Sequence, residues 1–558
     1  MFAAASLLAA RALQPPPSPS PPPPLLVLPL PTSMTSSPGC LLLSPTFDIV
    51  SSGSGGGDGD ALLAGAMARA AAIVRSVGSR GESVAAPCAG GGAGTLTSLV
   101  VTVAAARAAP YPALGDNETY ALELDSQGAT LRAPTVWGAM RGLETMSQLV
   151  SADAAGAAAR VLFVPAARVA VADAPRWSHR GLMLDTGRAF LPVPTILASL
   201  DAMAYAKLNT LHWHISDDEA FPLASTTFPL LSGKGAMQAP ATSHVYSPAD
   251  VRAVVDAAQA RGIRVIPEFD VPGHATSWFL GYPSLATDCV LPPGASFTKP
   301  MDPTLNSTYD FLAALFDETR AAFPDAFAHV GGDEVEMACW QNSTAVADFM
   351  RAHGIATFPQ LQLYFEARVF AQLNATRRVV MWEGVSGSNN AYPQGAVVEV
   401  WKERAGNATV LEALARQGFT LVWTSPDWYL DWDYTSGAGT DSHVNGPTEW
   451  LHYHAVDPLA NTTLTPQQQA LLLGGEVCAW SPYTDATNII TTIFPRASAA
   501  AERLWSQPGA AVDEPGALTD RMRAHRCRLV ARGIAAAPIE WAGSCPNVGA
   551  QPYSPPYA

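Results

Sequence analysis

Residues 326–335 read Ala-Phe-Ala-His-Val-Gly-Gly-Asp-Glu-Val, an apolar run that ends in two glycines and two adjacent acids. The run from Ala326 to Val330 predicts a short buried strand, and the glycines after it permit a tight turn because they carry no side chain. Neighbouring carboxylates at a strand end are electrostatically costly, since each raises the pKa of the other and burial raises both. Acidic pairs usually lie in solvated surface turns, but the apolar flank and the glycines favour a functional site here.

The same unit, an apolar run that ends in polar residues, recurs eight times after Pro175, with longer helical segments between the runs. Strands that alternate with helices predict repeated βα units and a parallel sheet. Eight units over roughly 350 residues fit a (β/α)8 TIM barrel with insertions. The alternative is a doubly wound open sheet, which predicts a Gly-rich phosphate loop after the first strand, and residues 184–188 do not form one. The predicted strands are Gly181–Asp185, Leu208–Asp218, Ile263–Asp270, Phe327–Glu334, Val379–Glu383, Val397–Lys402, Thr420–Asp431 and Leu472–Trp480.

The 558 residues exceed one ordinary domain, so we expect an α/β protein in which a small α/β domain precedes the barrel. Residues 1–60 predict a low-complexity N-terminal segment with a signal-like start, a Pro/Ser run and a first strand at Leu25–Leu30. Residues 61–174 predict the small domain, and residues 175–558 the catalytic barrel. Within the small domain we expect helices at 61–77 and 135–150 and strands at 99–105 and 119–124.

Composition narrows the class of partner. A net charge of −15 and a pI near 5.1 argue against nucleic acid or an anionic membrane as the partner. Hydrophobic residues make up 48% of the chain, enough for a large core, and no segment is long and apolar enough to span a bilayer.

Cysteines and glycosylation sequons indicate the secretory pathway, with a lysosome, a vacuole or the extracellular space as the destination. Six N-x-Ser/Thr sequons accompany seven cysteines. Sequence alone does not fix the connectivity. The pairings we expect, with Cys478 left free, are Cys40–Cys88, Cys289–Cys339 and Cys527–Cys545.

Catalytic groups of a TIM barrel come from the C-terminal ends of several strands. The ends here combine one arginine, several acids, one histidine and a set of aromatic residues, a combination that suits a sugar. Carboxylates and arginine bind hydroxyls in bidentate fashion, and indole rings cover the apolar faces of the pyranose. The alternative interpretation is that these aromatic side chains are core residues without a functional role, because tryptophan is mostly buried. The strand-end residues are Arg188, Asp217, His274, Asp333, Glu334, Trp382, Trp401, Tyr429, Asp431 and Trp480.

A metal or nucleotide cofactor is not expected. His212 and His214 share one face of a strand, but no matching third ligand follows them in the sequence, so buried structural histidines are the better interpretation. There is no Gly-x-Ser-x-Gly elbow or Walker loop.

The adjacency of the two acids restricts the mechanism. Most glycosidases use two carboxylates that face each other across the scissile bond, and these normally come from different strands. Asp333 and Glu334 are neighbours and cannot easily reach opposite sides of one bond. Glu334 can protonate the leaving oxygen, whereas Asp333 would orient a 2-acetamido group whose own carbonyl oxygen acts as the nucleophile. Such substrate-assisted enzymes are a recognised exception to the two-carboxylate pattern.

Several long motifs, in order from about Tyr111 to Cys545, resemble the family 20 β-N-acetylhexosaminidases, most closely the eukaryotic lysosomal or vacuolar branch. The motifs are His-Arg-Gly-Leu-Met-Leu-Asp-Thr-Gly-Arg (179–188), Leu-His-Trp-His-Ile-Ser-Asp-Asp (211–218), Glu-Phe-Asp-Val-Pro-Gly-His (268–274), His-Val-Gly-Gly-Asp-Glu-Val (329–335) and Pro-Arg-Ala-Ser-Ala-Ala-Ala-Glu-Arg-Leu-Trp (495–505). The resemblance implies an exo-acting, retaining hydrolase that removes terminal GlcNAc or GalNAc from oligosaccharides, glycoproteins or glycolipids. A homodimer is left open.

The resemblance also assigns roles. It implies that Glu334 is the general acid and base, that Asp333 orients the acetamide, and that Tyr429 hydrogen-bonds the acetamide carbonyl. Asp217 and His274 resemble a relay that tunes Glu334.

The remaining strand-end residues are assigned to sugar binding by the same resemblance. Trp382, Trp401 and Trp480 would wall the acetamide pocket, and Arg188 and Asp431 would hold ring hydroxyls.

One position departs from the family pattern. After Trp480 the family usually shows Gly-Glu, whose carboxylate also binds sugar hydroxyls, whereas Ser481 and Pro482 follow here. We therefore expect altered binding at the 4- and 6-hydroxyls, which leaves the preference between GlcNAc and GalNAc open. The alternative function is a secreted glycan-binding protein that has kept the pocket and lost the chemistry. The intact Asp333, Glu334 and Tyr429 favour the enzyme, because binding alone needs no acid.

Overall fold

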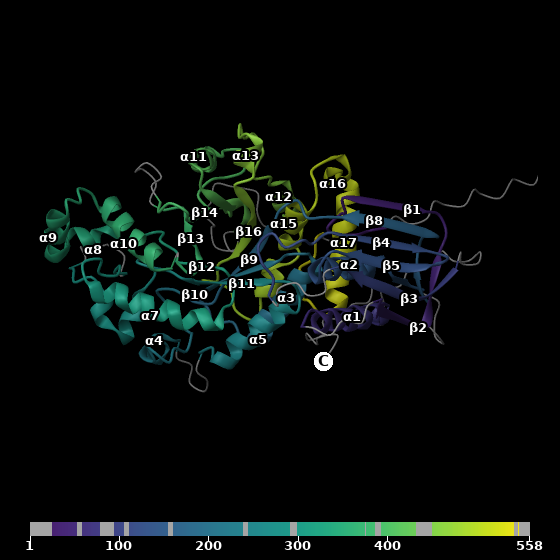
Figure 1. The fold of residues 1–558 in the computed structure, drawn as a ribbon, viewed down its shortest axis with the longest axis horizontal. Helices are drawn as coiled ribbons and strands as arrows, with labels where there is room; N and C mark the ends of the chain where they lie inside the picture. Colours follow the sequence, from purple (N-terminus) through teal and green to yellow (C-terminus); the bar gives the residue numbers. More distant parts are fainter. Residues whose placement is uncertain are drawn as a thin grey trace, which may run out of the picture.

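The computed structural model describes residues 25–52, 58–78, 94–104, 111–153, 160–237, 244–290, 298–373, 375–384, 392–430, 449–540 and 545. It divides into a sheet domain and a closed barrel, arranged along one long axis (Figure 1). In Figure 1 the sheet lies at one end, the helices α1 (Asp58–Ser76) and α2 (Val136–Leu149) cover the face toward the barrel, and the barrel lies beyond them.

The N-terminal sheet has eight strands in the order β1-β8-β4-β5-β3-β2-β7-β6. The predicted helix at 135–150 is confirmed as α2, and it begins where the side chain of Thr135 accepts a hydrogen bond from the amide of Gly138, a standard N-cap. The strands are β1 (Ser33–Ser37), β2 (Leu41–Ser51), β3 (Gly94–Val103), β4 (Tyr120–Asp125), β5 (Gly128–Ala133), β6 (Ser151–Ala152), β7 (Leu162–Val164) and β8 (Arg168–Asp173).

The N-terminal limit of this domain differs from the prediction. Strands β1 and β2 lie inside the stretch that we assigned to the low-complexity segment, yet both belong to the sheet. The predicted strand at Leu25–Leu30 is wrong, because this segment is irregular. Pro29 cannot donate a ladder hydrogen bond, and the backbone of Leu28 bonds instead to the side chain of Gln148 on α2, at 2.9 and 2.8 Å. Residues 1–24 lie outside the described residues.

The predicted barrel is confirmed, and each of its eight strands overlaps a predicted one. The strands pair in parallel around a closed ring in the order β10-β11-β12-β13-β14-β15-β16-β9. They are β9 (His179–Asp185), β10 (Thr210–Ser216), β11 (Arg264–Phe269), β12 (Phe327–His329), β13 (Arg378–Trp382), β14 (Val397–Val400), β15 (Thr420–Trp423) and β16 (Leu472–Ala479).

Helices surround the barrel and bury its outer face. Side chains of these helices form one large apolar cluster with the outward residues of the strands. The helical segments are α3 (Val193–Tyr205), α4 (Leu230–Gly235), α5 (Pro248–Gln259), α6 (Thr276–Gly281), η1 (Pro283–Leu285), α7 (Asn306–Ala322), α8 (Met337–Gln341), α9 (Thr344–His353), α10 (Phe358–Leu373), α11 (Thr409–Gln417), η2 (Pro426–Trp428), α12 (Trp450–Ala455), α13 (Pro466–Gln469), α14 (Ile489–Ile493), α15 (Arg496–Trp505), α16 (Ala510–Asp513) and α17 (Pro515–Ala531).

The interior of the barrel is filled in layers, as in other eight-stranded barrels. The lower layer is apolar and contains Ile266, Phe327, Val380, Val397 and Val422. Two residues further along several strands, the inward side chains become histidine and glutamate. The change of chemistry along the barrel axis therefore points the polar groups toward the C-terminal ends of the strands.

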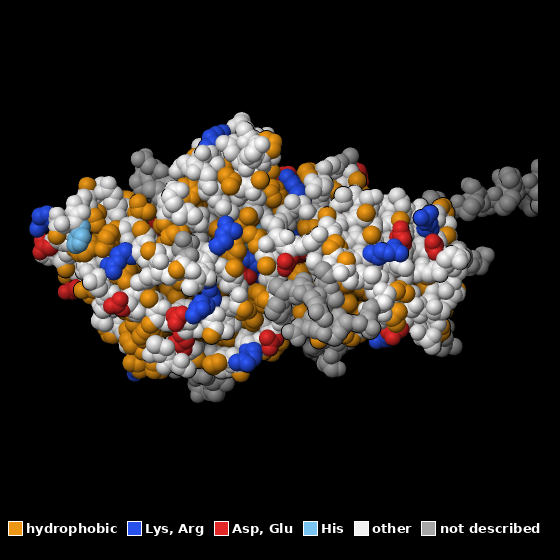
Figure 2. Space-filling view, in the orientation of Figure 1, with side chains coloured by type: hydrophobic (Ala, Val, Ile, Leu, Met, Phe, Trp, Pro, Cys, Tyr) orange, Lys and Arg blue, Asp and Glu red, His pale blue; other side chains and the backbone are white. Residues whose placement is uncertain are grey.

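Two of the three predicted disulfides are confirmed, Cys289–Cys339 and Cys527–Cys545, and Cys478 is buried and belongs to no disulfide among the described residues. Cys40 is disulfide-bonded as well, and Cys88 lies outside the described residues, so that pairing stays a prediction. No helix in the described part of the chain is long and apolar enough to cross a bilayer. On the face drawn in Figure 2, lysine and arginine side chains are interspersed with acidic ones rather than gathered into a basic patch.

Candidate active site

The turn after β12 places the two adjacent acids. Gly331 and Gly332 have φ values of +67° and +99°, in the region that favours glycine. A Cβ atom on Gly331 would lie 1.8 Å from Oδ1 of Asp270, so no other residue fits there. The same Oδ1 accepts a hydrogen bond from the amide of Gly332 at 2.9 Å. The backbone is therefore held close to Asp270, and the acids that follow emerge at the mouth of the barrel.

The two acids of the pair occupy different environments. Asp333 is 8% exposed, and its Oδ1 atom is buried with no hydrogen-bond partner among the described residues. The Glu334 side chain is 61% exposed and its residue has a φ of +46°, which is uncommon outside glycine. The two adjacent acids are therefore not equivalent: the carboxylate of Asp333 faces into the site, and that of Glu334 faces its opening.

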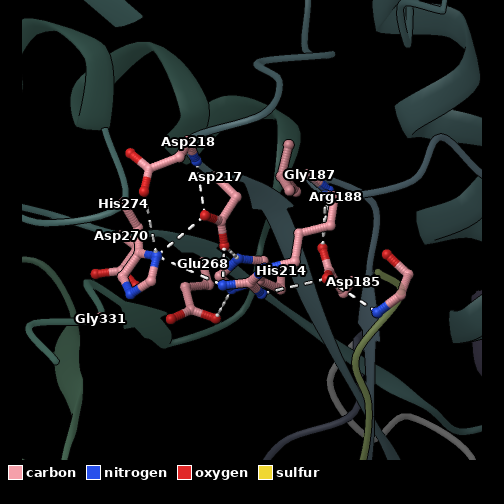
Figure 3. A network of polar contacts seen from close by, with 12 residues as sticks. Asp185, Gly187, Arg188, His214, Asp217, Asp218, Glu268, Asp270, His274 and Gly331 are labelled. Carbon is pink, nitrogen blue, oxygen red and sulfur yellow. Dashed lines mark hydrogen bonds and ion pairs between the residues drawn. The ribbon is translucent and has the colours of Figure 1, made fainter. Parts of the chain in front are cut away.

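A chain of ionisable side chains runs from Glu334 into the barrel, and Figure 3 shows its inner part. His274 Nε2 lies 3.6 Å from Glu334 Oε2 and 3.9 Å from Asp333 Oδ2. Its Nδ1 lies 3.0 Å from Asp217 Oδ1. The other oxygen of Asp217 is 2.8 Å from Arg188 Nη2. The predicted relay residues are therefore brought together with both acids.

Charges in this chain fix which groups carry protons. Burial favours the neutral form of Asp217, but hydrogen bonds from His214 and His274 outweigh it and hold the pKa of Asp217 well below its usual range. Burial opposes protonation of His274, yet Asp270, Asp217 and Glu334 together raise the pKa of His274 well above its usual value. The neighbouring His274 lowers the pKa of Glu334 against the opposing effect of burial. His274 is therefore a protonated imidazolium between carboxylates.

Aromatic side chains cluster near Asp333. Trp382, Tyr429, Met183 and Cys478 form one buried cluster, with Trp401 and Trp480 packed against it. The rings of Trp401 and Tyr429 are nearly parallel, with centroids 6.5 Å apart. Burial, with Cys478 and Asp333 nearby, raises the pKa of Tyr429 well above its usual value, so its hydroxyl remains a donor.

The predicted sugar-binding residues are brought together only in part. Arg188 bonds to Asp185 at 3.3 Å and lies over the ring of Trp480, 4.9 Å from its centroid. Asp431 lies outside the described residues, so its place stays a prediction. Pro482 is exposed, and the backbone amide of Ser481 before it donates to Asp185 at 3.1 Å. The loop after β16 is thus tied to the carboxylate that also holds Arg188.

The sequence analysis missed a buried network of histidine and glutamate beneath the site. Glu268 accepts from His214 Nδ1 at 2.5 Å with one oxygen and from Trp382 Nε1 at 2.6 Å with the other. His214 Nε2 in turn bonds to Asp217 at 2.8 Å. One carboxylate therefore binds Trp382 directly and reaches Asp217 of the relay through His214. Glu399 on β14 and Glu476 on β16 extend the network.

The sequence shows no third ligand after His212 and His214, but the folded chain brings other possible ligands close to His212. His212, Glu268 and His329 place ligand atoms within 4.8 Å of one another, because they come from three different strands. His212 Nε2 lies 2.9 Å from Glu268, and its Nδ1 lies 2.7 Å from Glu476. These are ion-pair distances, the second of them a hydrogen bond, and both predicted histidines are buried as expected.

Comparisons with known proteins agree on the class, a glycoside hydrolase. The glycosyl hydrolase family 20 catalytic domain matches residues 177–508, and a beta-acetyl hexosaminidase like domain matches residues 27–149. The chain therefore belongs to glycosyl hydrolase family 20.

Individual relatives cover most of the chain. Beta-hexosaminidase subunit beta of Mus musculus is 42% identical over 438 residues, which is 78% of this chain and 77% of the relative. The Homo sapiens subunit beta is 42% identical over 439 residues, 78% of this chain and 74% of the relative. Among solved structures, the Flavobacterium johnsoniae chitobiase aligns with a TM-score of 0.73 at 25% identity, over 91% of this chain and 73% of that one. The Streptomyces plicatus N-acetyl-β-hexosaminidase in complex with Thio-NAglucal aligns with a TM-score of 0.71 at 26% identity, over 94% and 98%.

Proposed function

We infer that this protein is an exo-acting β-N-acetylhexosaminidase that removes terminal non-reducing N-acetylhexosamine from glycans. The observation that carries the conclusion is that the two acids of the pair lie in different environments. Asp333 is buried against the aromatic pocket with a free oxygen, whereas Glu334 is open at the mouth. A retaining, substrate-assisted mechanism is typical of this family and needs such a pair.

We propose that Glu334 is the general acid and base. Its carboxyl group donates a proton to the glycosidic oxygen as the bond between C1 and that oxygen breaks. The protonated His274, held by Asp217, lies 3.6 Å away and supplies positive charge beside Glu334 when it becomes an anion. A bound sugar that covers the mouth would desolvate Glu334 and raise its pKa, which favours the protonated form before the reaction. His274 and Asp217 thus act through Glu334.

The acetamide group of the substrate is the proposed nucleophile. Its carbonyl oxygen bonds to C1 as the leaving group departs, which gives a cyclic cation that Asp333 stabilises through the acetamide N–H. The unpartnered Oδ1 of Asp333 is the acceptor for that N–H, and the hydroxyl of Tyr429 is the donor to the carbonyl. Water then attacks C1 and gives its proton to Glu334, which reopens the ring with net retention at C1.

Sugar recognition follows from the same surroundings. Trp382, Trp401 and Trp480 would enclose the acetamide methyl group and the apolar face of the ring. Arg188 would bind ring hydroxyls, together with Asp431. Pro482 has no side-chain acceptor, so the 4- and 6-hydroxyls would be held by fewer charge-assisted hydrogen bonds than a carboxylate there would give.

The assembly and compartment are further proposals. The mouse and human relatives are named as subunits, and we propose a homodimer for this chain. The disulfides fit the oxidising secretory pathway, and we propose a lysosomal, vacuolar or extracellular destination. We also propose that the domain boundary lies near residues 174–175, where β8 ends shortly before β9 begins.

Release of p-nitrophenol from its β-N-acetylglucosaminide and β-N-acetylgalactosaminide tests the function. Turnover that retains the β-configuration at C1, followed by NMR of the first product, is expected. The alternative glycan-binding protein would bind N-acetylglucosamine in a calorimeter and release no p-nitrophenol. Binding without turnover, in protein whose circular dichroism shows a folded chain, would overturn the proposed activity.

A further inference from the structure

Helix α10 lies directly behind the catalytic turn. Gln362 on this helix is buried, and its Nε2 donates two hydrogen bonds. One goes to the backbone oxygen of Gly332 at 2.6 Å and the other to Oε1 of Glu366, one helical turn further on, at 2.7 Å. On its other side, the amide of Gly332 donates to Asp270. The residue immediately before the acid pair is therefore gripped through both its N–H and its C=O.

Glu366 is an unusual group to bury at this place. Its side chain is enclosed, and among the described residues Gln362 supplies the hydrogen bond to it while no lysine, arginine or histidine lies within ion-pair distance. A Cβ atom on Gly332 would lie 3.2 Å from its Oε1, so the carboxyl group abuts the turn itself. A buried charge without a countercharge is costly, and an apolar residue would pack at lower cost. The catalytic scheme above gives this carboxyl group no role.

We propose that Gln362 and Glu366 are positioning residues that hold the Gly331–Gly332 turn, and through it Asp333 and Glu334, and that the proton on Glu366 makes this hold depend on pH. The inference rests on the proposed hexosaminidase activity of the acid pair. With Glu366 neutral, the amide of Gln362 bridges the helix and the turn. With Glu366 ionised, a buried charge without a countercharge abuts Gly332, and the cost of keeping it buried opposes the packing of α10 against the turn.

The surroundings of Glu366 place this transition near neutrality. Burial raises the pKa of Glu366 to about 8, against a small opposing effect of Gln362. The ionisable groups that face this region from other elements are acidic or neutral. They are Tyr392, which accepts from the amide of Gly384, and Glu383 at the end of β13, with Asp270 and Asp333 across the turn. Lys402 donates to the backbone oxygen of Gly384 and forms no ion pair with Glu366 among the described contacts. The turn is therefore expected to be held in acid and loosened above about pH 8.

The first test compares two amides of the same helix. Gln362→Met removes the donors to the catalytic turn at similar volume, whereas Gln372→Met removes a bond from α10 to the backbone oxygen of Tyr309, at 3.2 Å. A misplacement of about 1 Å can cost about 100-fold in rate, so kcat of Gln362→Met should fall roughly 10- to 100-fold with a smaller change in KM. Gln372→Met should keep kcat. Equal kcat values for the two variants would overturn the positioning role.

The second test uses the pH profile, since Glu366→Gln keeps the shape of the side chain and cannot ionise. Hydrolysis of p-nitrophenyl N-acetylglucosaminide should match wild type near pH 5, and the decline of kcat above pH 7 should become shallower. A thiazoline analogue of N-acetylglucosamine provides a readout without turnover: its Kd should rise between pH 7 and 9 for wild type and stay flatter for the variant. Superimposable wild-type and variant profiles in both measurements would overturn the proposal. A different outcome would refute only the proposed activity. In that case neither protein hydrolyses the substrate, but the pH dependence of the thiazoline Kd still differs between wild type and Glu366→Gln.

Discussion

Replacing Glu334 with glutamine isolates the proton donor, because little else depends on that side chain. The Glu334 side chain is 61% exposed, and the described contact of its carboxylate is with His274 at 3.6 Å. An amide of equal size leaves no cavity, and His274 keeps its 3.0 Å contact with Asp217. Surface changes of this kind usually alter the free energy of unfolding by less than about 0.5 kcal/mol. We therefore expect an unchanged melting temperature and a loss confined to catalysis.

The size of that loss follows from the chemistry. General acid help contributes about 10²–10⁴-fold, which is about 3–5.5 kcal/mol of transition-state stabilisation. It matters only where the leaving oxygen needs a proton. A series of aryl N-acetylglucosaminides with leaving phenols of different acidity should show the full loss of kcat/KM for the least acidic phenols and a much smaller loss for dinitrophenol. An equal loss across the series would refute the assignment of Glu334, and so would a large drop in melting temperature.

Four other outcomes are expected. Asp333→Asn should lose activity on 2-acetamido sugars and bind a thiazoline less tightly than wild type; a glycosyl group trapped on Asp333 and detected by mass spectrometry would contradict the substrate-assisted route. A thiol count on denatured, unreduced protein should find one thiol, that of Cys478, and three or more would break the pairing scheme. Pro482→Glu should lower KM for GlcNAc substrates about tenfold at nearly constant kcat, through hydrogen bonds worth roughly 1.5–3 kcal/mol; an unchanged KM would show that another group already holds the 4- or 6-hydroxyl. The melting temperature should be highest between about pH 4.5 and 6.5, and a maximum above pH 8 would contradict the proton assignment of His274.

Sequence periodicity predicted the barrel because its strands are short and almost entirely buried on both faces. Runs such as Arg378–Trp382 and Val397–Val400 are mostly apolar and do not alternate between an apolar and a polar face. The N-terminal limit was missed for the opposite reason. β1 is a largely exposed five-residue strand of Ser, Met and Thr, and it pairs only with β8, more than 130 residues later in the chain. Such a strand is defined by its distant partner, which local composition does not reveal.

In the site, too, residues with a distinctive local sequence were predicted, and residues defined by contacts with distant parts of the chain were not. Asp333 and Glu334 stand out in the sequence because adjacent acids after two glycines are chemically unusual. Glu268 does not stand out, since its partners lie on other strands, yet a signal existed: it follows the apolar interior residue Ile266 by two positions, as His329 follows Phe327. Counting inward positions by twos from each strand would have placed these residues in one layer. Gln362 and Glu366 lie on a helix outside the barrel, and the sequence carries no comparable sign of their contact with the turn.

The pKa values of the site residues are shifted by burial and by neighbouring charges, and these shifts determine how stability depends on pH. Burial and the charge of Asp333 raise the pKa of Asp270 well above its usual value, whereas the nearby His274 lowers it. His274 has a raised pKa as a cation between carboxylates, so its stabilising effect is complete below about pH 6.5 and is lost as the pH rises through its folded value. Asp217 and Glu268 have lowered pKa values, so their contribution is present above about pH 4.5 and is lost only in stronger acid. These contributions to stability are all present only at mildly acidic pH, between about 4.5 and 6.5. In that window Asp333 and Glu334 both lie beside the cation of His274, at 3.9 and 3.6 Å, and this attraction offsets the repulsion between two adjacent carboxylates at one strand end.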